Sequence, residues 1–290
     1  MFNLKIKSLV VVLSFLLFFS PITAQTTPPK LEFPAPSPAS TIKQRVGVTD
    51  IEISYSRPSL KGRKAFGNLV PFGQIWRTGA NSATKIKFST AINFGGANIP
   101  AGTYELFTIP GPAEWTVIVH KDSSQWGAYQ YKPENDVTRV KAMPVSLSSP
   151  VESFTIDFST LRDDSATLNL TWEKTSVPIK ITVDLISLVP QIEAVMASSE
   201  VKKPYANAAM FYLEHGQDLT KAAAWMDAAI AAQPTAFFLV YRKAKILAAA
   251  GDKAGALAAA TASLEAAMKA KSPVGEEYTK LNQDLIASLK

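Results

Sequence analysis

The stretch Asp50-Ile-Glu-Ile-Ser-Tyr55 shows the pattern that decides the fold of this chain. Its apolar residues, Ile51, Ile53 and Tyr55, alternate with polar ones, which is the period of a β-strand with one buried face. The same alternation returns in later runs, around residues 86–92, 115–120, 154–158, 168–172 and 179–185. Clusters of glycine, asparagine, aspartate and proline separate these runs, as turns between strands would.

Strands with a single apolar face belong to antiparallel sheets, and that face must be covered by another layer. Two sheets packed face to face meet this need. We therefore predict an all-β sandwich, jelly-roll-like in outline, over residues 45–188. A closed barrel is the alternative that the same pattern leaves open.

After Pro190 the apolar period changes to 3.6 and alanine dominates, which predicts a small all-α domain of helical hairpins over residues 191–290. Gly216 and Gly251 stand about 35 residues apart in a weak internal repeat, close to the period of tetratricopeptide repeats. Two repeat units are few for a free solenoid, so we expect this domain to lean on the β-domain or on a partner. The predicted helices lie near residues 204–215, 218–232, 235–250, 252–271 and 274–289.

The N-terminus has the pattern of a signal peptide over residues 1–24. Lys5 and Lys7 precede an apolar run that ends before Pro21, and Thr23-Ala24 offers a small-residue cleavage site. The alternative is a membrane anchor, but the run is shorter than the ~20 residues that cross a bilayer. We therefore expect a periplasmic or secreted protein with no transmembrane segment after cleavage. The proline-rich residues 25–44 are interpreted as an extended linker.

Composition excludes several classes of chemistry. The chain of 290 residues has no cysteine and two histidines, which removes thiol catalysis, disulfides, thiolate metal sites and multi-histidine metal sites. Its net charge of +6 is a mild excess that does not by itself indicate a nucleic-acid partner. We expect no metal and no cofactor. His120 falls on the polar face of a strand and is interpreted as a surface histidine rather than a catalytic one.

The sharpest local feature is the absence of Asp and Glu from Ser54 to Tyr104, a stretch that carries seven Lys and Arg residues. Within it, residues 59–82 show no strand period, and long irregular stretches in compact domains are often functional. Guanidinium groups offer paired donors suited to carboxylate or phosphate. The alternative is that these cations are solvated, or that they hold the loop by bonding backbone carbonyls.

A second irregular stretch, residues 122–135, carries Trp126, Tyr129 and Tyr131, whose rings suit sugars or peptide side chains but also serve as loop anchors. If the two stretches meet in space, they would form a basic, aromatic-lined groove. The candidate ligand-binding residues are Arg57, Lys61, Arg63, Trp76, Arg77, Asn81, Trp126 and Tyr129.

Three long motifs resemble the bacterial domain-of-unknown-function family 2911. They are Tyr55-Ser-Arg-Pro-Ser-Leu-Lys-Gly-Arg63, the run from Phe66 to Asn81, and Ile99-Pro-Ala-Gly-Thr-Tyr-Glu-Leu-Phe-Thr-Ile-Pro110. The resemblance covers about residues 45–187. It implies an exported protein, sometimes with C-terminal helical repeats. It does not indicate an activity, and no catalytic residue can be carried over from it.

Three functions remain open from the sequence. The first is a non-catalytic binding or scaffold module of the bacterial envelope, which binds an anionic glycan, peptide or small molecule through the β-domain and a protein through the helical domain. The second is an envelope hydrolase that uses carboxylates near the loops. The third is a purely structural domain in which residues 59–82 plug an open end of the sandwich, with Phe66, Phe72 and Trp76 buried.

Overall fold

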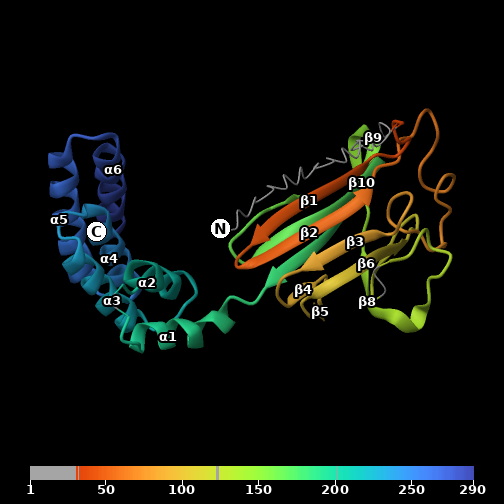
Figure 1. The fold of residues 1–290 in the computed structure, drawn as a ribbon. Coiled ribbons are helices and arrows are strands. Elements are labelled where there is room, and N and C mark those ends of the chain that lie inside the picture. Colours follow the sequence, from red (N-terminus) through yellow and green to blue (C-terminus); the bar gives the residue numbers. More distant parts are fainter. Residues whose placement is uncertain (1–30, 32, 122–123, 201) are drawn as a thin grey trace, which may run out of the picture. The chain divides into compact units, whose positions relative to one another are not determined.

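The structure is a computed structural model that describes residues 31, 33–121, 124–200 and 202–290. The signal peptide predicted over residues 1–24 lies outside the described residues. The described residues before Ser37 are exposed and belong to no helix or strand. Strands make up the first part of the chain from Ala39 onward, and helices make up the second part (Figure 1).

Six strands form the larger sheet in the order β1-β2-β3-β6-β7-β8, and every neighbouring pair is antiparallel. The bounds are β1 Ala39–Val46, β2 Thr49–Ser56, β3 Thr84–Phe88, β6 Gly102–Ile109, β7 Trp115–His120 and β8 Asp136–Ala142. Figure 1 shows β1, β2, β3 and β6 lying side by side in this order. In β2, Ile51, Ile53 and Tyr55 are buried, as the alternation predicted.

The smaller sheet has four strands in the order β5-β4-β10-β9, again antiparallel throughout. Its strands are β4 Ile92–Phe94, β5 Ala97–Ile99, β9 Val145–Ser159 and β10 Ser165–Val183. The inward side chains of both sheets share one apolar core, so the prediction of a two-layer β-sandwich is confirmed.

The 27 residues between β2 and β3, residues 57–83, form a single long insertion that we call the cap loop. Trp76 pairs with Thr108 of β6 through two backbone hydrogen bonds of 2.8 and 2.9 Å, and Ser59 bridges to Ser153 of β9. The cap loop therefore contacts both sheets. Phe66 and Trp76 are buried in the shared core, whereas Phe72, which a plug would also bury, is 42% exposed.

Five aromatic rings meet where the cap loop enters the core. Trp76 stacks on Trp172 of β10 with centroids 6.0 Å apart and an interplanar angle of 15°. Phe66 meets Trp115 of β7 edge to face at 4.7 Å, and Phe154 of β9 lies 5.0 Å from Trp76. Edge-to-face and offset contacts suit the ring quadrupoles, so the cluster joins the two sheets and the loop.

Strand β1 begins inside the stretch 25–44 that the sequence assigned to a linker. It is an edge strand that pairs with β2 alone, and its buried or half-buried apolar side chains are few, with Ile42 and Val46 the main ones. Such a strand carries little alternating signal. The proline-rich part of the segment ends at Pro38, and the strand begins at the next residue, Ala39.

In the described part of the chain, six helices follow the β-domain: α1 Val189–Ala197, α2 Tyr205–Glu214, α3 Leu219–Ala232, α4 Phe237–Ala249, α5 Lys253–Ala270 and α6 Pro273–Ser288. The five predicted helices agree with α2 to α6 to within two residues at each end, and α1 was missed. Consecutive helices from α2 to α6 pack on one another, and α2 also packs on α4. The prediction of an all-α domain after the sandwich is confirmed.

The internal repeat has a structural basis at the end of α2 and of α4. Gly216 (φ 64°) and Gly251 (φ 83°) follow these helices in the left-handed conformation that glycine adopts without strain. Asp218 then caps α3 by accepting from the backbone N–H groups of Thr220 and Lys221, and Asp252 caps α5 by accepting from that of Gly255. The two helical hairpins thus share one turn chemistry. None of the helices in the described ranges has the length and apolar character that a membrane span requires.

Trp76→Ala should lower the free energy of unfolding of the β-domain by about 3–5 kcal/mol, because it empties the centre of the aromatic cluster. Urea denaturation followed by tryptophan fluorescence and circular dichroism measures this change. Phe72→Ala is the matched control on the same loop, and its half-exposed ring should cost less than about 1 kcal/mol. Equal losses in the two variants would contradict the role assigned to Trp76.

Candidate functional site

The arginines of the cap loop hold the loop to the protein itself. The Arg57 side chain donates from Nε to the carbonyl of Phe154 at 3.0 Å and from a terminal nitrogen to Thr155 Oγ1 at 2.6 Å. Arg63 donates to the carbonyls of Leu60 and Ser59 at 2.9 and 3.0 Å. Arg57 and Arg63 therefore hold the loop, which is the alternative that the sequence left open for these cations. Fewer of the predicted donors remain to bind a ligand.

The remaining cap-loop candidates are dispersed. Lys61 is exposed, and its backbone N–H donates to Glu152 at 2.8 Å. Trp76 is 7% exposed and donates its indole N–H to the carbonyl of Gly79 at 3.0 Å, so it serves the core. Arg77 is half-buried, and its Nε makes no hydrogen bond to the part of the chain that the structure describes.

The two irregular stretches predicted from the sequence do meet. The end of the cap loop runs antiparallel to residues 125–127, with Ala83 N donating to Gln125 O and Gly127 N donating to Asn81 O, both at 3.1 Å. Ser82 bridges Trp126 in the middle of this short ladder. We call residues 124–131 the platform loop.

The platform loop presents Trp126 and Tyr129 to solvent. These side chains are 66% and 81% exposed, and their rings stack with centroids 6.0 Å apart at an interplanar angle of 19°. Large rings in soluble proteins usually bury most of their area. Two of them held parallel and open to water form a flat apolar surface, so the alternative that both are buried loop anchors is wrong. Tyr131, by contrast, does anchor the loop.

A buried carboxylate of the larger sheet holds the platform loop in place. Glu105 of β6 is fully buried and accepts from the backbone N of Gln125 at 2.7 Å and from Gln125 Nε2 at 2.9 Å. Gln125 Nε2 also lies 3.3 Å from His120 Nδ1, and His120 Nε2 lies 3.2 Å from the carbonyl of Lys132. The residue directly before Trp126 is therefore held by both its main chain and its side chain.

His120 is buried, which corrects its interpretation as a surface histidine. It lies on the outer face of β7, as the alternation indicated, opposite Glu105 of β6. The rings of Phe107 and Tyr131 pack on it, with centroids 5.5 and 5.3 Å away. The alternation of a strand shows which face a residue takes, and it does not show that a loop covers that face.

Tyr131 closes the far end of the platform loop. Its hydroxyl donates to Asp136 at 2.8–2.9 Å, and Arg139 donates to both the Tyr131 hydroxyl at 2.8 Å and Asp136 at 2.6 Å. Burial and the hydrogen bond to Asp136 raise the pKa of Tyr131 to about 12. The phenol is therefore neutral, and remains a donor, throughout the physiological pH range.

A groove of about 260 Å³ lies beside the ladder, where β1, β2 and the start of β3 meet the end of the cap loop. Its lining residues include four with hydroxyl side chains, Thr41, Ser54, Ser56 and Ser82, and one cation, Lys85. Asn81 borders the groove and donates to Ser56 Oγ at 3.2 Å and to the carbonyl of Ser37 at 3.3 Å. These hydroxyl residues were not among those predicted from the sequence, because isolated Ser and Thr on a strand carry no signal.

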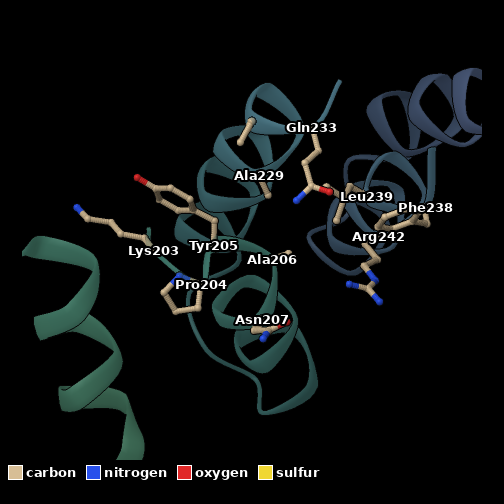
Figure 2. A pocket seen from close by; sticks show the side chains of 11 residues that line it. Lys203, Pro204, Tyr205, Ala206, Asn207, Ala229, Gln233, Phe238, Leu239 and Arg242 are labelled. Atoms are coloured by element: carbon tan, nitrogen blue, oxygen red, sulfur yellow. The ribbon is translucent and has the colours of Figure 1, made fainter. Parts of the chain in front are cut away.

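The helical domain has a separate pocket of about 290 Å³ between α2, the end of α3 and the start of α4 (Figure 2). Lys203 points away from Arg242, and its amine donates to the carbonyl of Met196 at 2.7 Å. The Arg242 guanidinium lies 5.9 Å from the ring centre of Phe238. The polar groups of this pocket do not converge on one point, so the β-domain holds the better candidate site.

These observations define a class: an antiparallel β-sandwich with a long loop inserted into its core, followed by a helical domain. A family model described as "Protein of unknown function (DUF2911)" matches residues 37–181, half of the chain. The chain therefore belongs to this family, as the motifs of the cap loop indicated. The match begins just before β1 and ends within β10. No curated protein and no solved structure matches the chain.

Glu105→Gln should loosen the platform loop, because one of the two oxygens that accept from Gln125 is replaced by an NH₂ group that faces another donor. Leaving a buried donor unpaired costs about 1–3 kcal/mol. Hydrogen exchange of peptides that cover residues 124–131 should then be faster by about tenfold or more, with the core strands unchanged. Glu114→Gln is the control, since the ion pair of Glu114 with Lys141 is solvent-exposed. Unchanged exchange in Glu105→Gln would contradict the anchoring role.

Proposed function

We propose that this protein is exported to the bacterial envelope and acts there as a non-catalytic binding module, whose β-domain binds a glycan on the platform loop. The observation that carries the proposal is the stacked, solvent-exposed pair Trp126 and Tyr129. One face of a pyranose ring is made of C–H groups, which carry partial positive charge and pack well on the negative face of an aromatic ring. The hydroxyl-rich groove beside the pair supplies hydrogen-bond donors and acceptors for the sugar hydroxyls.

The rigidity of the platform loop supports binding over a purely structural role. A ligand site gains affinity when its groups are held in place before the ligand arrives. The backbone ladder with the cap loop and the bonds from Glu105 to Gln125 provide that support on both sides of Trp126. A structural loop would gain more by burying the two rings than by exposing them.

The hydrolase alternative finds less support. His120 and Glu105 are cross-strand neighbours, but both are fully buried and both contact Gln125 of the platform loop. A substrate would have to displace that loop to reach them.

The proposal for the helical domain, a tetratricopeptide-like surface that binds a protein partner, rests on its two hairpins of similar turn chemistry.

Trp126→Ala and Tyr129→Ala should each weaken glycan binding by about tenfold or more, because burying one aromatic face on a ligand contributes about 1.5–3 kcal/mol. A glycan array identifies the ligand, and isothermal titration calorimetry measures the dissociation constants. Phe72→Ala is the matched control, an exposed aromatic residue of the cap loop outside the platform. Full affinity in both platform variants, with circular dichroism like that of the unmodified protein, would refute this site.

Export predicts a mature chain that begins at Gln25. N-terminal sequencing of the protein recovered from the periplasm or medium of an expressing bacterium should read Gln25-Thr-Thr-Pro-Pro. Deletion of residues 2–24 should retain the protein in the cytoplasm. A chain that keeps its first 24 residues and sediments with membranes would favour the anchor alternative instead.

A further inference from the structure

The cations of the acid-free stretch differ in what they contact. Arg57 and Arg63 bond to carbonyl and hydroxyl groups of their own chain, as described above. Lys85, on the outer face of β3, is exposed and lines the hydroxyl-rich groove. Within the described ranges, no ion pair involves Lys85, and no Asp or Glu lines that groove.

The register of the sheet gives Lys85 one hydroxyl and one carboxylate as cross-strand neighbours. In the register of the sheet it stands opposite Ser54 of β2 on one side and Glu105 of β6 on the other. Both carboxylate oxygens of Glu105 accept hydrogen bonds from Gln125, beneath the platform loop. On the groove side, Lys85 has the Ser54 hydroxyl as its neighbour, which itself lies 3.0 Å from Thr41 Oγ1.

Lys87, two residues further along β3 on the same face, provides the contrast. It stands opposite Glu52, which accepts from Lys43 at 2.8 Å. The hydrogen bond and the charge of Lys43 lower the pKa of Glu52, and Lys87 adds to this effect. Each lysine thus has one carboxylate of its own chain across the ladder, and the two differ in that Lys85 lines the groove whereas Lys87 does not.

From this arrangement we propose that the groove is a subsite for an acidic sugar, in which the Lys85 amine binds the carboxylate of a uronic acid while the adjacent residue of the polysaccharide stacks on Trp126. This inference rests on the proposed glycan-binding function. Ser82 connects the two subsites, since it lines the groove and is the bridge partner of Trp126. Side chains of directly opposed residues in an antiparallel ladder point to the same face, so Ser82 and Trp126 share one face of this short ladder. A single lysine matches a monovalent carboxylate.

The test uses the mature full-length protein and three uronate polymers, polygalacturonate, alginate and hyaluronate, each compared with its carboxyl-reduced neutral form. The unmodified protein should bind at least one acidic polymer more tightly than the reduced form. Lys85→Gln should remove this preference, weakening binding to the acidic form by about tenfold or more, as expected for a hydrogen bond to a charged group. Lys87→Gln, the matched control, should retain the preference, and added salt should weaken it.

Two results would overturn the subsite while leaving the glycan-binding function intact. One is that the protein binds the acidic and the reduced polymers with equal affinity, while Trp126→Ala abolishes binding to both. The other is an equal loss of affinity in Lys85→Gln and Lys87→Gln, which would show a diffuse charge effect. Binding that survives Trp126→Ala and Tyr129→Ala together would instead refute the proposed function itself.

Discussion

The insertion of Trp76 between the two sheets is the interaction on which the rest of this β-domain depends. Its ring meets Trp172 of the smaller sheet, and its backbone pairs with Thr108 of the larger one. A loop of 27 residues loses much conformational entropy when it orders, and this burial, with that of Phe66, offsets the loss. Because Trp76 fixes the cap loop, the last residues of this loop pair with the platform loop in one register.

A second constraint lies on the opposite face of the larger sheet. Polar residues on an outer face usually meet water, but here Glu105 and His120 are covered and their hydrogen bonds are made within the protein. A buried carboxylate is tolerable only when donors satisfy it, and Gln125 supplies two. Burying this cluster costs free energy, and the cluster holds the loop on which Trp126 and Tyr129 are exposed to solvent.

The sequence predicted the fold better than the site, for physical reasons. Alternation in β2 and β7 and alanine-rich periodicity in α3 and α5 report burial directly, so the sandwich and the helices were found. Edge strand β1 has a weak apolar face and was missed. Charge counts could not distinguish Arg57 and Arg63, which bind carbonyl groups, from the exposed Lys85. Trp126 and Tyr129 were identified as candidates, but their exposure depends on Glu105, a contact 20 residues away from Gln125 in the chain.

The anchoring of the platform loop has an evolutionary consequence. The bonds that hold it use the main chain at residues 81, 83, 125 and 127, together with the side chains of Gln125, Glu105 and Tyr131. None of them involves the indole of Trp126 or the phenol of Tyr129. Substitutions at these two positions would therefore leave these bonds in place, so one backbone frame would suit a repertoire of recognition surfaces that diversifies by point substitution.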